Sequence, residues 1–189
     1  VETRRLSPDL CRQVRASILL AGPMLGRFGQ VELPPPGGDV IGRRRIDTHL
    51  LAFEAMGATV DVDAANMQIV IQSRRLHGAD IMLDEASVTG TENALMAAAL
   101  IPDTITIRNA ASEPHVQNLC HMLAGMGVSI EGIASNTLTV HGARRLHGGE
   151  FTIGPDLLEI GSFLGLGAVT RGELRIKDVS PSDLRMVLH

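Results

Sequence analysis

The chain contains an internal repeat with a period of 70 residues. The segment 56–60 (MGATV) returns as 126–130 (MGVSI), and 74–78 (RRLHG) returns as 144–148 with the same five letters. Self-similarity at a fixed period indicates that one supersecondary unit has been copied. The chain is therefore expected to fold into similar α/β units packed around a pseudo-symmetry axis.

Each copy is expected to hold two helices and four short strands. The first helix of the first copy spans about 47–56 and ends at Gly57, which can adopt the left-handed conformation; its counterpart starts near Pro114. Alternating and β-branched runs predict the remaining elements. These are strands at 58–62, 67–71, 80–83 and 104–108 with a helix at 92–100, then strands at 128–131, 137–140, 151–153 and 173–177 with a helix at 156–170. A partial copy precedes them, with Ser7-Pro8 opening a helix through Leu20 and a strand at 31–33.

Composition excludes several classes of function. Four Phe without Trp or Tyr offer few stacking platforms, which weakens the case for binding single-stranded nucleic acid. A net charge of −4 argues against a duplex-binding surface, with local basic patches as the alternative. No apolar run approaches a membrane span and no signal peptide opens the chain, which favours the cytoplasm. Cys11 and Cys120 are too far apart for a metal motif and are expected to be buried free thiols.

The loop 34–49 concentrates the polar chemistry. It places Asp39 in a Pro/Gly-rich stretch, followed by the run Arg43–Arg45, then Asp47 and His49. The pairs at 74–75 and 144–145 recur in both copies and are read as architectural, whereas the run at 43–45 has no copy. An acid beside several guanidinium groups suits a phosphorylated substrate that needs a proton. A solvated charge run is the alternative.

Simpler readings stand beside each candidate. Asp39 is also a common turn residue, and three arginines favour its ionised form unless a bound anion neutralises them. Asp47 is equally an N-cap for the helix that follows. His49 is more typical of a surface histidine or a satisfied one than of a catalyst, and Arg15 is more typical of a solvated charge on a helix.

The segment 87–92 (SVTGTE) has two readings. Thr89 and Glu92 match a capping box at the start of an apolar helix. The alternative is a phosphate held by the loop hydroxyls and the helix N-terminus, against which the charge of Glu92 argues. The sequence carries no phosphate-binding P-loop, dinucleotide fingerprint, metal signature or nucleophile elbow.

With these motifs in order, the chain resembles the bacterial UDP-N-acetylglucosamine enolpyruvyl transferases. The resemblance covers essentially the whole chain and rests on the segments 15–18 with 22–23, 37–44, 47–49, 54–58, 87–88 with 91–93, 109–111 with 113–114, and 155–156. It implies an α/β prism (an inverse α/β barrel) built from βαβαββ-type repeats with pseudo-threefold symmetry. Residues 1–155 would form most of one domain and 156–189 the start of a second.

The resemblance also implies an activity. This is transfer of the enolpyruvyl group from phosphoenolpyruvate to the 3′-hydroxyl of UDP-N-acetylglucosamine with release of phosphate, the first committed step of peptidoglycan synthesis. No metal or organic cofactor is implied, and neither nucleic acid nor a membrane is a partner. The partners are the two small-molecule substrates and the second domain of the parent chain. The alternatives are a shikimate-pathway enolpyruvyl transferase of the same fold and a non-catalytic anion-binding repeat module.

Site residues follow position by position from the resemblance. Asp39 stands where most members carry a loop cysteine and would be the proton donor, which predicts insensitivity to fosfomycin, an alkylator of that cysteine. Arg44 and Arg15 would bind phosphate. The run Arg44, Arg45, Ile46, Asp47 and Thr48 would follow the uridine nucleotide, with Arg45 in place of the usual Pro. Ser87 and Val88 would belong to the diphosphate loop, and Glu85 stands where many members have Lys.

The match is to a central segment of the family's sequence. The Lys-Asn pair that grips phosphoenolpyruvate would lie before Val1, and the general base would lie after His189. The segment alone is therefore expected to be catalytically incompetent.

Overall fold

The structure is a computed structural model that describes residues 5–39, 41–42, 44–63, 65 and 68–188. The chain separates into two compact units, Val1–Glu150 and Phe151–His189, each of which is described by itself. The family-based boundary at residues 155–156 stays a prediction.

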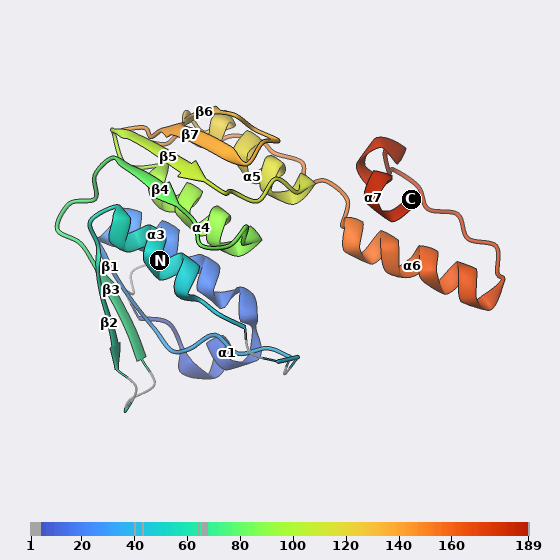
Figure 1. Cartoon of the computed structure of the whole chain (residues 1–189), viewed down its shortest axis with the longest axis horizontal. Coiled ribbons are helices and arrows are strands. Elements are labelled where there is room, and N and C mark those ends of the chain that lie inside the picture. Colours follow the sequence, from blue (N-terminus) through green and yellow to red (C-terminus); the bar gives the residue numbers. More distant parts are fainter. Residues whose placement is uncertain (1–4, 40, 43, 64, 66–67, 189) are drawn as a thin grey trace. The chain divides into compact units, whose positions relative to one another are not determined.

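The first unit alternates helices with short strands (Figure 1). In chain order they are α1 (Pro8–Gln13), the 3₁₀ helix η1 (Arg15–Leu20), α2 (Ala21–Phe28), β1 (Gln30–Leu33), α3 (Asp47–Ala55), β2 (Thr59–Asp63), β3 (Gln68–Gln72), β4 (Ala79–Met82), α4 (Val88–Ala98), β5 (Thr104–Arg108), α5 (Pro114–Gly125), β6 (Ser129–Glu131) and β7 (Thr137–His141).

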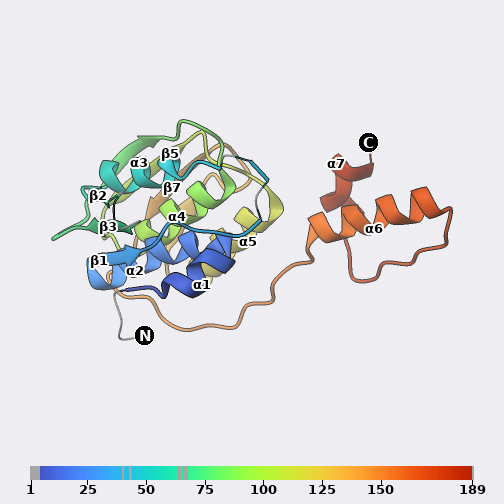
Figure 2. The same ribbon diagram turned by 90° about the horizontal axis from the view of Figure 1, so that it is seen from below.

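Two sheets flank the helices of this unit. One has the strand order β1-β3-β2 and is antiparallel; the other has the order β4-β5-β7-β6, in which only β4 and β5 are parallel. Helix α4 packs against α2, α3 and α5 and also contacts β5 and β7. Seven of its residues are buried and the other four are half-buried. Helices inside and sheets outside confirm the predicted inverse α/β arrangement (Figures 1 and 2).

The repeat is visible as two matching helix–hairpin units, α3-β2-β3 and α5-β6-β7. Gly57 and Gly127 follow the helices with φ of 90° and 104°. His77 and His147 each donate a backbone N–H to the carbonyl just before that glycine, at 3.0 and 3.1 Å, and each imidazole lies against the glycine. The arginine pairs next to these histidines are exposed in both copies, as expected for solvated ends of the hairpins.

Replacing Gly57 with alanine should therefore destabilise the first unit. A Cβ at this position would lie 2.6 Å from His77 Nε2, and the positive φ is strained for any L side chain. We expect the free energy of unfolding in urea to fall by about 1–3 kcal/mol. Gly148→Ala is the matched control, because a Cβ there meets nothing within 4 Å. Equal stability of the two variants would contradict the prediction.

The single helix predicted from Ser7 to Leu20 is wrong, because the chain is extended at Val14. Val14 has φ −130° and ψ 116°, which separates α1 from η1. The break leaves the Cys11 and Arg12 carbonyls free to accept hydrogen bonds from Gly37 and Gly38, at 2.9 and 3.1 Å. A long-range contact therefore ends a helix that the local pattern would continue.

The second unit holds α6 (Leu157–Thr170), the 3₁₀ helix η2 (Pro181–Leu184) and α7 (Arg185–Leu188). Asp156 caps α6 by accepting from two backbone N–H groups, so the predicted helix is confirmed. The predicted strands at 151–153 and 173–177 are wrong. No described residue of this unit forms a strand that could pair with them, and a strand without a partner leaves its backbone groups unsatisfied.

Both cysteines are free and buried, as predicted. Burial raises the pKa of the Cys120 thiol to about 11, which keeps it protonated and unreactive at neutral pH. None of the helices in the described ranges combines the length and apolarity needed to cross a membrane.

Candidate functional site

Arg15 is the first residue of η1 and ties three parts of the polar loop together. Its guanidinium donates to the Arg44 and Arg45 carbonyls, both at 3.0 Å, and to the Pro36 carbonyl at 3.4 Å. Burial, followed by the charge of Arg44, lowers the pKa of Arg15 from its ordinary value. Arg15 is thus a tertiary clamp on the loop, and the prediction of a solvated helix charge is wrong.

Gly37 and Gly38 bring the loop onto the end of α1. A Cβ at Gly37 would overlap the Arg12 carbonyl, and Gly38 has φ 90° and lies against the backbone of Arg15. Only glycine allows this approach at both positions. Asp39 follows directly and is exposed. The two glycines therefore fix the predicted proton donor beside the element that carries Arg15.

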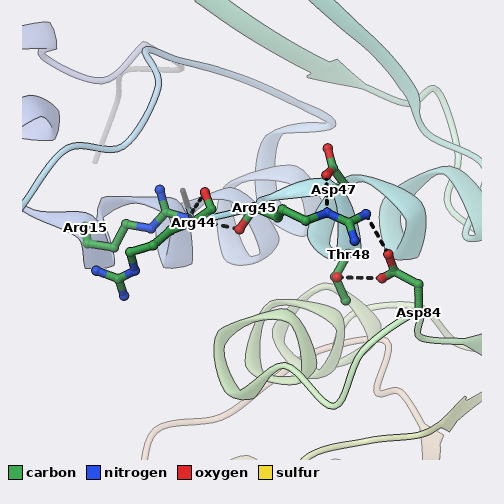
Figure 3. A network of polar contacts seen from close by, with 6 residues as sticks. All are labelled: Arg15, Arg44, Arg45, Asp47, Thr48 and Asp84. Carbon is green, nitrogen blue, oxygen red and sulfur yellow. Dashed lines mark hydrogen bonds and ion pairs between the residues drawn. The ribbon is translucent and has the colours of Figure 1, made fainter. Parts of the chain in front are cut away.

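The arginine run divides into residues with different surroundings. Val40 and Arg43 lie outside the described residues. Arg44 is exposed, and within the described part of the chain the structure pairs its guanidinium with no carboxylate. Arg45 is engaged by two carboxylates, Asp47 at 2.7 Å and Asp84 at 2.9 Å (Figure 3). A hydrogen bond from its side chain to Asp47 is the main cause that raises the pKa of Arg45.

Asp84 links the segment 45–48 to the loop that precedes α4. Its Oδ1 accepts from the Thr48 hydroxyl at 2.6 Å, and its Oδ2 accepts from Arg45 (Figure 3). The hydrogen bond from Thr48 is the first cause that lowers the pKa of Asp84, with Arg45 adding to it. Thr48 is buried, so its hydroxyl points into this contact rather than into solvent.

The two residues at the start of α3 differ from expectation. Asp47 is not the N-cap: it is the first helical residue, and the N-cap position is taken by Ile46 without a side-chain cap. The Asp47 carboxylate pairs with Arg45 instead. Ile46 is half-buried against the core. Because Asp47 is already the first helical residue, it is one position too late to be the N-cap.

Helix α4 begins one turn earlier than predicted. Ser87 is its N-cap and accepts from the Gly90 N–H at 3.1 Å, so the capping box assigned to Thr89 and Glu92 is wrong. Val88 opens the helix and packs against the core. Glu92 is half-buried, and desolvation raises the pKa of its carboxyl.

A buried polar group lies directly behind the loop. Asn93 is fully buried and hydrogen-bonds to the Gly22 N–H, the Ile18 carbonyl and His49 Nδ1, at 2.9, 2.8 and 2.8 Å. His49 Nε2 lies 3.3 Å from the Thr89 hydroxyl. His49 is therefore a satisfied histidine, as the sequence suggested. Asn93 fixes together η1, α2, α3 and α4, the elements that carry the candidate residues.

The arrangement gathers most of the predicted residues. Arg15, Arg44, Arg45, Asp47 and Thr48 lie in one polar network, and Asp84 connects that network to the loop that ends at Ser87 and Val88 (Figure 3). Sequence reasoning missed Asp84 and Asn93. Asp84 could have been found, because a carboxylate directly after an apolar strand often lies at a site. Asn93 gave no such signal.

The arrangement is suited to binding an anion near the carboxyl group of Asp39. An exposed Arg44, backbone N–H groups at the start of α4 and the exposed carboxyl of Asp39 are available to a ligand. Within the described ranges, no group of three His, Cys, Asp or Glu side chains is arranged to hold a metal ion.

Comparison with known proteins gives consistent findings. The model of the EPSP synthase (3-phosphoshikimate 1-carboxyvinyltransferase) family matches residues 2–189. The UDP-N-acetylglucosamine 1-carboxyvinyltransferase of Treponema denticola is 58% identical over 98% of this chain, and that of Bradyrhizobium diazoefficiens is 53% identical over 96%. This chain covers 43% and 42% of those relatives, so it spans less than half of their length.

Solved structures share the fold. The enolpyruvyl transferase NikO from Streptomyces tendae superposes with a TM-score of 0.70 at 23% identity, over 86% of this chain and 38% of its own. The EPSP synthase from Acinetobacter baumannii gives a TM-score of 0.58 at 19% identity, over 79% of this chain and 33% of its own.

Proposed function

The chain belongs to the EPSP synthase (3-phosphoshikimate 1-carboxyvinyltransferase) family, and from this premise we propose that it is part of a UDP-N-acetylglucosamine 1-carboxyvinyltransferase. The enzyme would transfer the enolpyruvyl group of phosphoenolpyruvate to the 3′-hydroxyl of UDP-N-acetylglucosamine and release phosphate. This is the committed step of peptidoglycan synthesis, and its location would be the cytoplasm. The identity of more than 50% to relatives of that name favours this acceptor over others.

One observation carries the proposal. Arg15 binds the carbonyls of Arg44 and Arg45, which brings together the two segments that bear the candidate phosphate-binding cations. Gly38 holds the Asp39 loop against the same arginine. A phosphorylated substrate next to Arg44 would therefore lie close to a carboxyl that can donate a proton.

The family resemblance supplies the mechanism, and these positions support it. Asp39 donates its proton to the methylene carbon of phosphoenolpyruvate while the sugar 3′-oxygen bonds to the adjacent carbon, which gives a tetrahedral intermediate. A base then takes a proton from the new methyl group as phosphate departs, which re-forms the carbon–carbon double bond and gives the enol ether. Arg44, with Arg15 behind it, neutralises the phosphate as charge develops. The base that takes the hydroxyl proton is not among the residues of this network.

The nucleotide would lie along the part of the network formed by residues 45–48 and the start of α4. Arg45, Ile46, Asp47 and Thr48 would follow the uridine nucleotide, and Ser87 with Val88 would meet the diphosphate at the start of α4. The Ser87 Oγ already accepts from the Gly90 N–H, so its own hydroxyl proton remains for a phosphate oxygen.

The test is an assay of phosphate release by the protein produced at the full length of its relatives. With phosphoenolpyruvate, we expect release to depend on UDP-N-acetylglucosamine and not on shikimate 3-phosphate. The second acceptor is included because the matched family model is described by that reaction. Release that depends on shikimate 3-phosphate would replace our proposal with 3-phosphoshikimate 1-carboxyvinyltransferase activity. If neither acceptor supports phosphate release, both functions are rejected.

Fosfomycin gives an independent check of Asp39. A carboxylate is a far weaker nucleophile toward the drug than a thiolate, so the wild-type enzyme should keep its activity after incubation with fosfomycin. Asp39→Cys should remain active and become covalently inactivated, with one adduct visible by mass spectrometry. Cys11 and Cys120 are buried internal controls that should stay unmodified. Inactivation of the wild type with an adduct on Asp39 would contradict the prediction.

A further inference from the structure

Asp84 follows a well-anchored residue, Leu83, just after the end of β4. Its neighbour Leu83 is 1% exposed, donates its N–H to the Arg108 carbonyl at 3.1 Å and accepts from the Asn109 side chain at 3.0 Å. The backbone that carries Asp84 is therefore fixed to the end of β5. The loop into α4 starts from this fixed point.

Both carboxylate oxygens of Asp84 bind the run at the start of α3. Thr48 donates to Oδ1 at 2.6 Å and Arg45 donates to Oδ2 at 2.9 Å, across 36 and 39 residues of sequence. Thr48 is 1% exposed, so water cannot readily replace Asp84 as its partner. Charge-assisted hydrogen bonds of this length are stronger than neutral ones.

Arg45 is consequently held at both ends. Its carbonyl accepts from Arg15, and its guanidinium is shared between Asp47 and Asp84. A guanidinium between two carboxylates is already neutralised and has little attraction left for a phosphate. Arg44, one residue earlier, has no such carboxylate partner among the residues that the structure describes.

We propose that Asp84 is a positioning residue of the nucleotide site: it clamps the segment 45–48 to the loop that leads into Ser87 and Val88. The proposal deepens the function proposed above and rests on it. Arg45 then acts as part of the clamp, while Arg44 is the cation that meets the substrate. A site assembled in advance spares the ligand the ordering of two separate loops, so its loss should weaken nucleotide binding.

An ordinary surface ion pair is the competing explanation, and the chain offers a matched control for it. Arg108 and Asp80 form a comparable pair between β5 and β4, with contacts of 2.8 and 2.9 Å and side chains that are 50% and 61% exposed. Exposed pairs of this kind contribute little to stability. If Asp84 were only such a pair, its removal would resemble the removal of Asp80.

The experiment compares Asp84→Ala, Asp84→Asn, Thr48→Val and the control Asp80→Ala in the protein at the full length of its relatives. For Asp84→Ala we expect the KM for UDP-N-acetylglucosamine to rise about tenfold, the size of one lost charged hydrogen bond. The KM for phosphoenolpyruvate and kcat should change less than about twofold, and Asp80→Ala should match the wild type. Asp84→Asn and Thr48→Val should show smaller rises in the same KM.

The outcomes separate the two proposals. An unchanged nucleotide KM in Asp84→Asn and Asp84→Ala, or an equal rise in Asp80→Ala, would overturn the positioning role and leave the proposed function intact. A wild-type enzyme that ignores UDP-N-acetylglucosamine would overturn both. Melting temperatures identify a variant that fails to fold; in that case Asp84→Asn, which keeps an oxygen acceptor for Thr48, decides the question.

Discussion

Asp39→Ala in the full-length enzyme should lower kcat for phosphate release by about 10²–10⁴-fold, the usual contribution of a positioned general acid. The side chain is exposed and follows two glycines that hold the loop against Arg15. A bound phosphate would neutralise the nearby arginines and exclude water, which favours the protonated carboxyl at the moment it is needed. Because the proton moves only in the transition state, the KM values should change little.

Two variants make this result specific. Asp39→Asn keeps the shape of the side chain and removes its acidic proton, so it should lose as much activity as the alanine variant. Asp61→Ala removes an exposed carboxylate on β2, away from the network, and should retain full activity. Activity that survives in both Asp39 variants would exclude the residue as the proton donor.

Local sequence predicted the repeated core well. The helix ending at Gly57, the hairpin strands and β5 all appear, because apolar periodicity and a glycine at the left-handed position depend on neighbouring residues alone. Two failures involve other parts of the chain, whereas the misassigned caps at Asp47 and at Thr89 with Glu92 are local. The break at Val14 depends on Gly37 and Gly38, and the strands expected at 151–153 and 173–177 require pairing partners that the described part of the second unit does not provide.

In the candidate site, too, some residues could be identified from the sequence and others only from the structure. Asp39 and Arg44 could be identified from an unrepeated loop and a family resemblance, and their roles stay predictions. The clamp role of Arg15, the shared carboxylates around Arg45 and the position of Asp84 depend on contacts across 29 to 39 residues. No pattern within one segment contains that information, so a three-dimensional structure was needed to join these residues into a site.

The hydrogen bonds around His49 define its protonation state. Gly22 N–H can only donate and the Ile18 carbonyl can only accept, so the Asn93 amide must point its oxygen to Gly22 and its NH₂ to Ile18. The same NH₂ faces His49 Nδ1 at 2.8 Å, which must therefore be an unprotonated acceptor. Nε2 then carries the proton and donates to the Thr89 hydroxyl. A proton on Nδ1 would set two donors against each other.

The stability of the first unit should consequently fall as the pH drops below 6.5. Burial, followed by the charge of Arg15, lowers the pKa of His49 to about 4, against 6.5 in the unfolded chain. The stabilisation is complete above 6.5 and is lost as the pH falls from 6.5 to about 4, because only the unfolded chain takes up the proton. The loss reaches about 3 kcal/mol, since each pKa unit corresponds to about 1.4 kcal/mol.

Urea unfolding between pH 4.5 and 7 measures this effect in the wild type, in His49→Gln and in the exposed-histidine control His77→Gln. His49→Gln keeps an oxygen acceptor for Asn93 and cannot titrate, so it should lack the loss of stability that the wild type shows at low pH, whatever its absolute stability. His77→Gln should keep the wild-type slope. Glu92, whose raised pKa acts in the opposite direction, is common to all three proteins and cancels in the comparison. A wild-type slope in His49→Gln would mean that another group causes the acid sensitivity, and that the Asn93–His49 contact does not depend on a neutral imidazole.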